Sequence, residues 1–289
     1  MDQRTLKNIK WRKLKNNIFK MVFLLCTLFG VFFLVLLIKQ ILSAGLKNLN
    51  WEFLTRYASM RASKAGLYPA IVGSLWLIIL TAVIALPIGV GTAIYLEEYA
   101  KKNTFNKILQ INISNLAGIP SVIYGLLGLT VFVKSFGMGT SILAGALTLA
   151  LLILPVIIIA SQEAIKSVPD TLRQGSLALG VTKWQTVKGV VLPYSLPGIL
   201  TGSILAVSRA LGEAAPLVVV GAATYITFIP DSINSSFTAM PIQIYDWISR
   251  PEMEFQDLAS TGIIVLMAVL LTANTIAILF RNKYQKRFD

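Results

Sequence analysis

Long apolar blocks separated by short, mostly basic segments dominate the hydropathy pattern of this chain. A helix that crosses a bilayer needs about 20 mostly apolar residues, and six blocks reach that length. The pattern therefore predicts an all-α, polytopic membrane protein with six transmembrane helices. The predicted spans are residues 20–43, 69–95, 109–133, 140–161, 197–223 and 258–280.

The first span has a second interpretation as a signal peptide, because a basic stretch precedes it. Its uncharged run, Met21–Ile38, is longer than the roughly 7–15 apolar residues of a signal-peptide core. Leu42-Ser43-Ala44 is only a weak cleavage site. We therefore expect this segment to remain in the protein as a transmembrane helix.

The distribution of basic residues predicts the orientation. The four segments 1–20, 96–108, 162–196 and 281–289 together carry 18 Lys and Arg residues. The segments on the other side carry seven, of which five lie in residues 39–68. Basic residues are concentrated in cytoplasmic loops, so we expect both termini and the 162–196 loop to face the cytoplasm.

Composition excludes several classes of function. Hydrophobic residues make up 55% of the chain and charged residues 13%, with a net charge of +13. A basic excess often indicates nucleic-acid binding, but here it lies between apolar blocks. The chain has no His and a single cysteine, Cys26, which excludes a Ser-His triad and an intrachain disulfide. It has no Gly-Lys pair and hence no P-loop for ATP. These absences favour a transport subunit over an enzyme.

Proline falls inside four of the predicted spans. Each proline removes one backbone donor and frees a carbonyl, which in lipid needs another partner or a wet cavity. These residues are Pro87, Pro120, Pro155 and Pro216. The segment 115–128 also contains three glycines and several polar side chains, which suits either close helix packing or the wall of a passage. Pro120, Ser121 and Tyr124 are our candidates there.

The fifth span carries two charged residues, Arg209 and Glu213, near its middle. A charge at that depth costs at least about 2.5–3.5 kcal/mol and usually faces a bundle interior or an aqueous route. Four residues apart, the two side chains share one helix face and can pair. The alternative is an ion pair that only joins two helices. Ser208, the neighbour of Arg209, is a further candidate for the substrate pathway.

The chemistry of this pair favours an oxyanion as the substrate. A guanidinium is permanently charged and matches two oxygens at once. A carboxylate repels a fully deprotonated anion but accepts a hydrogen bond from one that still carries a proton, as phosphate does near neutral pH and sulfate does not. We expect Arg209 to contact phosphate, and Glu213 either to pair with Arg209 at rest or to read the phosphate proton.

Two segments outside the spans also show a pattern. Residues 241–248 predict either an interfacial helix with an aromatic anchor or a plain surface loop. In the 162–196 loop, Pro169 suits a first helical position and Gly180 a left-handed helix end. A capping box at Thr182–Gln185 then opens a second short helix, with Trp184, Val187 and Val191 on one side. This predicts a compact knob hinged at Gly180; the alternative is an amphipathic stretch on the bilayer.

The same loop resembles that of the permeases of binding-protein-dependent ABC importers, whose pattern is Glu-Ala-Ala-x3-Gly-x9-Ile-x-Leu-Pro. Gly180, Leu192 and Pro193 match, whereas Val190 replaces the isoleucine. The segment Gln174-Gly175-Ser176 replaces the acidic triplet, which weakens one polar contact to the ATPase. Residues 117–126, 209–216 and 241–251 are similar to the A-type permease subunit of phosphate-specific transport (Pst) systems. The resemblance covers about residues 66–280.

The resemblance implies a type I ABC importer permease (MetI-like) fold in a prokaryotic plasma membrane. Residues 1–20 and 281–289 would be cytoplasmic tails. Residues 21–65 would form the first transmembrane helix and an outer loop. Residues 66–280 would form the permease domain, with 162–196 as the loop that couples it to the ATPase.

The resemblance also implies partners and a mechanism. A sister permease, the C-type subunit, would form a heterodimer with this chain, and a phosphate-binding protein would dock outside. A homodimeric ATPase would bind ATP and magnesium and drive alternating access, while this chain would hold no cofactor or metal. The implied contacts to the ATPase are Gln174, Gly175, Ser176, Gly180, Trp184, Leu192 and Pro193. The alternatives are a permease for sulfate, molybdate or another oxyanion, and a stand-alone secondary transporter.

Overall fold

The computed structural model describes residues 3–101, 103–223 and 225–285, and these residues form helices and no strands. The predicted tail residues Lys286 and Arg287 lie outside the described residues, as do the first two residues. Within the described part, five helical segments are long and apolar enough to cross a membrane, or six if one bent pair counts as a single span. The expectation of an all-α, six-span membrane protein is confirmed.

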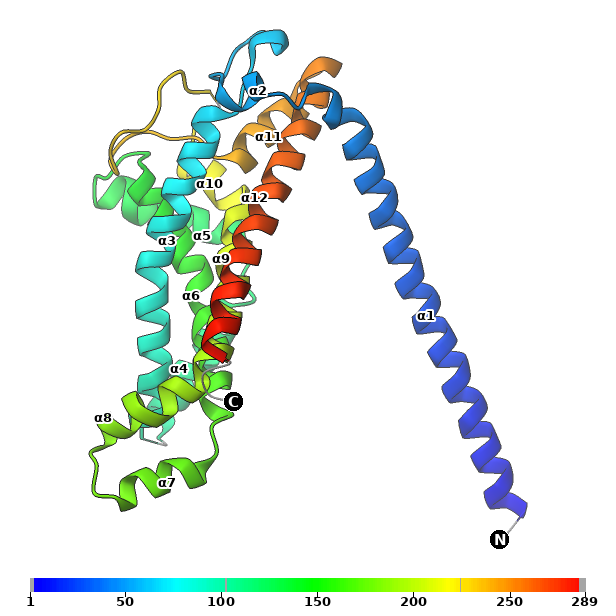
Figure 1. Ribbon diagram of the computed structural model, residues 1–289, viewed down its shortest axis with the longest axis vertical. Coiled ribbons are helices and arrows are strands. Elements are labelled where there is room, and N and C mark those ends of the chain that lie inside the picture. Colours follow the sequence, from blue (N-terminus) through cyan, green and yellow to red (C-terminus); the bar gives the residue numbers. More distant parts are fainter. Residues whose placement is uncertain (1–2, 102, 224, 286–289) are drawn as a thin grey trace.

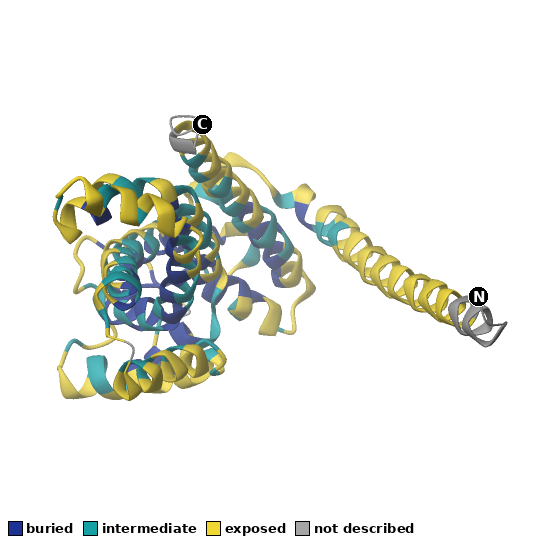
Figure 2. Ribbon diagram, turned by 90° about the horizontal axis from the view of Figure 1, so that it is seen from below, coloured by how far each residue is buried: buried dark blue, intermediate teal, exposed yellow. Residues whose placement is uncertain are grey.

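The first helix, α1 (Gln3–Gly45), stands apart from the rest of the molecule. It runs along the length of the bundle and approaches it only near Gly45, where the Thr261 hydroxyl donates to the Gly45 carbonyl at 2.9 Å (Figure 1). No residue in its most apolar window is buried, as Figure 2 shows. The short helix α2 (Trp51–Thr55) follows. In this single chain, only the C-terminal end of α1 therefore packs against the bundle, where it contacts α12.

The core of the bundle consists of α3 (Tyr68–Ile94), α6 (Ile142–Lys166), α9 (Leu192–Gly212) and α12 (Met253–Gln285). Small residues let these helices approach closely. A β-carbon added at Gly202 would collide with Ala160, and one added at Gly89 would collide with Ile157. α3 continues into the π-helical turn η3 (Tyr95–Tyr99).

The four prolines fall into two classes. Pro87 and Pro155 lie inside α3 and α6, which continue through them unbroken. Pro120 and Pro216 lie at helix starts, where the missing donor costs no intrahelical bond. Of these four, only Pro87 and Pro155 therefore remove a donor from the interior of a helix.

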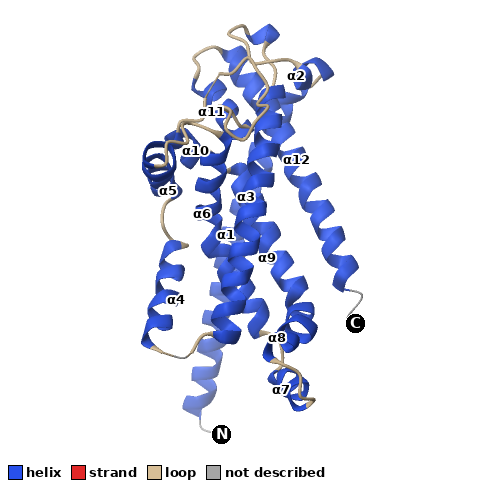
Figure 3. Cartoon of the chain, turned by 90° about the vertical axis from the view of Figure 1, so that its left-hand side faces the viewer, coloured by secondary structure: helices blue, strands red, loops and turns tan. Residues whose placement is uncertain are grey.

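The predicted third span, 109–133, is wrong as a single helix. The chain forms α4 (Thr104–Leu116), α5 (Ser121–Gly128) and the π-helical turn η4 (Leu129–Ser135), with a bend of 104° between α4 and the pair α5–η4 (Figure 3). Pro120 has a non-helical ψ of 137°. The Tyr124 hydroxyl donates to the Leu116 carbonyl at 2.8 Å, which closes the bend.

The fifth span also differs from its prediction. α8 (Lys183–Thr186), the π-helical turn η5 (Val187–Val191) and α9 form one continuous helical run that ends at Gly212. The second short helix predicted from the capping box begins at Lys183 as expected, but it continues through η5 into α9 instead of ending. The short helix α10 (Ala215–Val220) follows, so Arg209 lies in the last turn of α9 and not in the middle of a helix.

Residues 241–248 form a helix, α11 (Met240–Ser249), as one of the two interpretations of the sequence predicts. One face of this helix is buried: Trp247 is 1% exposed and its ring lies 5.8 Å from the ring of Phe53. Pro241 and Ile242 are buried as well. The other face carries Tyr245, which is 56% exposed. Tyr245, and not Trp247, is therefore the aromatic side chain that faces outwards, and its role as an interfacial anchor stays a prediction.

The connecting segments gather at two ends of the bundle. α7 (Asp170–Ala178) and α8 lie at one end, towards which both ends of the chain also point; α2 and α11 lie at the other (Figure 1). We call these the α7 end and the α2 end. The described parts of the four basic segments, residues 3–20, 96–101, 103–108, 162–196 and 281–285, all belong to the α7 end.

Candidate functional site

The intramembrane ion pair predicted from the sequence is present. The Nε of Arg209 lies 3.1 Å from Oε1 of Glu213. Arg209 belongs to the last turn of α9, and Glu213 is the residue that ends this helix, with extended backbone angles. The Arg209 side chain is 51% exposed and that of Glu213 18%. Half of the guanidinium side chain therefore faces space that this chain does not fill.

The pair lies at the level of the middle of the bundle, although the Arg209 side chain faces outwards from this chain. Ala206 and Ala210, which flank Arg209 on α9, belong to one apolar cluster with Ala85 and Ile153. Those two residues lie near the middle of α3 and α6. Arg209 thus reaches the middle of the transmembrane bundle, because α9 itself stops there.

Two broken helices meet beside the pair. A β-carbon at Gly125 of α5 would lie 2.8 Å from the Cα of Pro216 in α10, so these short helices touch backbone to backbone. Tyr124, on the same helix, is 7% exposed and belongs to the apolar cluster that contains Ala206 and Ala210, the residues that flank Arg209. Irregular backbone at this depth is tolerated where it is covered by protein or lines a water-filled cavity. Arg209, Glu213 and Tyr124 are therefore brought together, with Pro120 and Ser121 at the start of α5.

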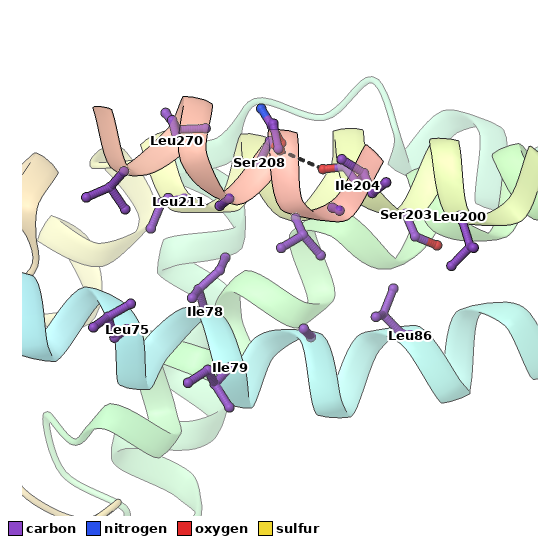
Figure 4. Close-up of a pocket in the computed structure, with 16 residues that line it drawn as sticks. Leu75, Ile78, Ile79, Leu86, Leu200, Ser203, Ile204, Ser208, Leu211 and Leu270 are labelled. Atoms are coloured by element: carbon purple, nitrogen blue, oxygen red, sulfur yellow. Dashed lines mark hydrogen bonds between the residues drawn. The ribbon is translucent and has the colours of Figure 1, made fainter. Parts of the chain in front are cut away.

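Ser208 contacts a different part of the molecule. Its hydroxyl contacts the side-chain oxygen of Asn274 on α12 and donates to the Ile204 carbonyl at 2.7 Å. Both residues line an apolar groove of about 340 Å³ between α3, α9 and α12 (Figure 4). The structure thus places this predicted pathway residue in a helix–helix contact, and Asn274 is a partner that the sequence gave no reason to choose.

The helices α7 and α8 and the turn between them form a helical hairpin at the α7 end. This hairpin has the local geometry that the sequence predicts. Gly180 has a φ of +79°, a left-handed conformation that follows α7. The capping box is complete, with the Thr182 hydroxyl accepting from the Gln185 backbone and the Gln185 side chain accepting from the Thr182 backbone. The Ser176 and Thr186 hydroxyls lie 3.0 Å apart and join the two arms. Pro169 caps α7 one residue earlier than predicted.

The hairpin exposes large apolar side chains. Leu172, Leu177, Leu179 and Trp184 are all exposed, with Leu179 at 83% and Trp184 at 59%. Val187 and Val191, predicted on the same side as Trp184, are instead buried against the bundle. Gln174 and Gly175 are also exposed, whereas Leu192 and Pro193 are partly covered. Exposed apolar clusters of this kind mark interaction surfaces.

The sequence-based candidates did not include the residues that connect this hairpin to α3. The Nε of Arg173 on α7 lies 3.1 Å from Oε1 of Glu98 in η3. Glu97 and Glu98 are two adjacent acidic residues in a segment, 96–108, whose other charged residues are all basic, and this is the signal in the sequence that could have drawn attention to them. No group of three or more His, Cys, Asp or Glu residues in the described part of the chain could hold a metal ion.

A family model and two similar proteins all identify this chain as a transport permease. Residues 85–289 match the model of the "binding-protein-dependent transport system inner membrane component" family. The chain is 37% identical over 206 residues to the probable ABC transporter permease protein YqgI of Bacillus subtilis, covering 71% of this chain and 70% of that protein. It is 33% identical over 246 residues to the phosphate transport system permease protein PstA of Mycobacterium leprae, covering 83% and 80%.

A solved structure supports the same fold. A chain of the bacterial alginate ABC transporter, crystallised in complex with an alginate pentasaccharide-bound periplasmic protein, superposes with a TM-score of 0.67. The alignment covers 96% of this chain and 97% of that chain at 18% identity. The fold is therefore that of a type I ABC importer permease, as expected from the sequence.

Proposed function

Because this chain belongs to the family of inner membrane components of binding-protein-dependent transport systems, we propose that it is the permease subunit of an ATP-driven importer of inorganic phosphate. Substrate would pass by alternating access through a route shared with a sister permease of the C type. This chain would contribute the substrate-facing groups and the contacts to the ATPase, and the ATPase subunits would bind ATP and magnesium.

The observation that carries this proposal is the position of Arg209. Its guanidinium is half exposed at the middle of the bundle, where α9 ends and two short helices meet. A permanent cation at that depth is costly unless it faces a polar route. Its single carboxylate partner, Glu213, leaves several donor N–H groups for an anion. The arrangement suits an anion that binds transiently.

Phosphate is the anion that this pair accommodates best. A monoprotonated or diprotonated phosphate can accept from Arg209 and donate its remaining proton to Glu213. Sulfate near neutral pH has no proton to donate, so the carboxylate would repel it. The similarity to the phosphate transport permease of Mycobacterium leprae supports the same choice.

The exposed apolar hairpin supports coupling to a separate ATPase. Leu179 and Trp184 are 83% and 59% exposed, and burying large apolar side chains of this kind contributes about 1.5–3 kcal/mol each. The sequence has no P-loop of its own. The 162–196 loop would therefore insert into an ATPase homodimer on the cytoplasmic side, with contacts from Gln174, Gly175, Ser176, Gly180, Trp184, Leu192 and Pro193.

The unburied surface of α1 supports the presence of a sister subunit. This helix reaches the bundle only near Gly45, and the rest of its apolar surface requires lipid or another permease. The α2 end would face outward and receive a phosphate-binding protein, and both termini would be cytoplasmic. In this arrangement, residues 21–65 would form the first transmembrane helix and an outer loop, and residues 66–280 would form the permease domain.

Transport by the reconstituted complex tests this function. The four kinds of subunit are reconstituted in liposomes with ATP inside, so that the ATPase faces the lumen, and uptake of labelled phosphate is measured with unlabelled arsenate or sulfate as competitor. We expect ATP-dependent uptake that arsenate blocks and sulfate leaves unchanged. Equal competition by sulfate would assign the protein to another oxyanion. Uptake by this chain alone without ATP would assign it to the secondary transporters.

A further inference from the structure

The π-helical turn at the end of α3 contacts three different helices through three consecutive side chains. Glu97 accepts a 2.7 Å hydrogen bond from the Gln162 side chain of α6. Glu98 pairs with Arg173 of α7. Tyr99 lies under the Lys183 ammonium group of α8, which is 5.1 Å from the ring centroid. Glu97, Glu98 and Tyr99 therefore hold α6 and both arms of the hairpin, and we call them the α3 clamp.

Arg173 is the most connected residue at this clamp. Besides Glu98, its guanidinium donates to the carbonyls of Ile165 and Val168, at 2.7 and 2.5 Å, and to the Asp170 carboxylate at 3.0 Å. Its side chain is 19% exposed and that of Glu98 10%. Hydrogen bonds between charged groups contribute about 1.5–3 kcal/mol each when they are shielded from water. Arg173 thus fixes α7 to α3 and to the end of α6.

The clamp matters because α7 and α8 do not follow α3 directly along the chain, so no short stretch of backbone connects them to it. Along the chain, α7 follows α6 through residues 167–169, and α8 continues into α9. A force on the hairpin reaches these two helices through the backbone. It reaches α3 directly only through side chains, and among the described residues the Arg173–Glu98 pair is the one close ion pair between α3–η3 and the hairpin. The Lys183–Tyr99 contact is more exposed and weaker, at about 0.5–1 kcal/mol.

We propose that Arg173 and Glu98 are positioning residues that make the hairpin and α3 move as one rigid body when the ATPase opens and closes. α3 packs against α6 and α9 at the level of Arg209, through the cluster that contains Ala85 and Ala210. A movement of the hairpin is therefore carried to the middle of the bundle by three helices rather than two. This inference rests on the proposed function, because it assumes that an ATPase acts on the hairpin.

A coupling assay tests this role in the assembled complex. ATP hydrolysis and phosphate uptake are measured together for Arg173→Gln, Glu98→Gln and the double variant. We expect hydrolysis to stay within about twofold of wild type while uptake falls at least tenfold, so that less phosphate enters per ATP. The double variant should lose no more than either single variant, because contacts that act through each other are not additive. Arg173→Lys should restore part of the uptake.

The matched control is Glu52→Gln, which removes an exposed carboxylate of α2, at the opposite end of the bundle, whose ion-pair partner is Arg56. We expect its ratio of uptake to hydrolysis to equal that of wild type. Unchanged ratios in all the Arg173 and Glu98 variants would overturn the inference. So would hydrolysis and uptake that fall in equal proportion. Failure of the wild-type complex to couple ATP to phosphate uptake would instead overturn the proposed function.

A distance measurement between η3 and α7 tests whether these two elements move together, and it does not depend on the substrate. Cys26, the single native cysteine, is replaced by Ser, and spin labels are placed at Tyr95 in η3 and Thr171 in α7, which are both exposed. We expect one narrow distance distribution, the same with and without ATP, and a broader one in Arg173→Gln. A wild-type distance that changes with nucleotide would show that α7 and α3 move separately, against the inference.

Discussion

Two arginine–carboxylate pairs in this protein have the same Nε–Oε1 distance of 3.1 Å but very different surroundings. Arg173 at the hairpin has four partners and is 19% exposed. Arg209 in the middle of the bundle has one carboxylate partner and is 51% exposed. The first guanidinium is saturated and the second is not. The comparison suggests that one pair holds helices together and that the other can exchange its carboxylate for a substrate oxygen.

Removal of the unsaturated cation should have the largest effect. Arg209→Ala should lower phosphate uptake by one to two orders of magnitude, because charge-assisted hydrogen bonds contribute about 1.5–3 kcal/mol each. Arg209→Lys should also be strongly impaired, since an ammonium does not match two oxygens at once. Uptake is measured in proteoliposomes that contain equal amounts of assembled complex. Normal uptake in both variants would remove Arg209 from the pathway.

Strain at the hinge of the hairpin should have the next largest effect. Gly180→Val places a β-branched residue at a φ of +79°, and this backbone strain costs about 1–2 kcal/mol. A steric clash adds nothing, because a β-carbon at this position would have no neighbouring atom within 4 Å. Phosphate uptake per ATP should fall several-fold. Gly180→Asn is the matched variant, because asparagine tolerates this conformation, and it should lose much less. Equal losses in the two variants would mean that side-chain volume, not backbone strain, matters here.

Neutralisation of the partner carboxylate should have a moderate effect. In Glu213→Gln, no carboxylate is present to replace the substrate at the Arg209 guanidinium, so the release of phosphate is slower. We therefore expect the maximal uptake rate to fall several-fold and the apparent affinity for phosphate to rise. Both quantities come from uptake measured over a range of phosphate concentrations. An unchanged rate and affinity would exclude an exchange of partners at Arg209.

The smallest effect is expected at Ser208. Ser208→Ala removes one helix–helix hydrogen bond to Asn274, and such bonds in membranes contribute about 0.6 kcal/mol on average. The thermal midpoint of unfolding in detergent should fall slightly, while phosphate uptake should stay close to wild type. A large loss of uptake at unchanged stability would return Ser208 to the substrate pathway.

Sequence reasoning succeeded where the signal lies within one helix or turn. The spacing of Arg209 and Glu213, the capping box at Thr182 and the left-handed Gly180 are all local patterns, which depend on neighbours within about four residues. The continuous apolar blocks other than the third depend on about 20 consecutive residues. In both cases the printed sequence contains the information that the prediction needs.

It failed where the structure depends on distant partners. The bend at Pro120 divides the third span because α5 turns to pack on α10. Ser208 meets Asn274 across 66 residues, and Arg173 meets Glu98 across 75. Trp247 packs against Phe53, which lies far away along the chain. None of these pairings follows from hydropathy, since helix rotation and tilt are set by packing.

The α3 clamp also constrains the length of the second membrane crossing. Each residue added to or removed from a helix turns everything beyond it by about 100° and shifts it by about 1.5 Å. A single insertion between Tyr68 and Tyr95 would point Glu97, Glu98 and Tyr99 away from all three of their helices at once. The contacts of η3 therefore fix the rotation of α3 about its axis. Point substitutions along the lipid-facing side of α3 keep this rotation, whereas a one-residue change in its length does not.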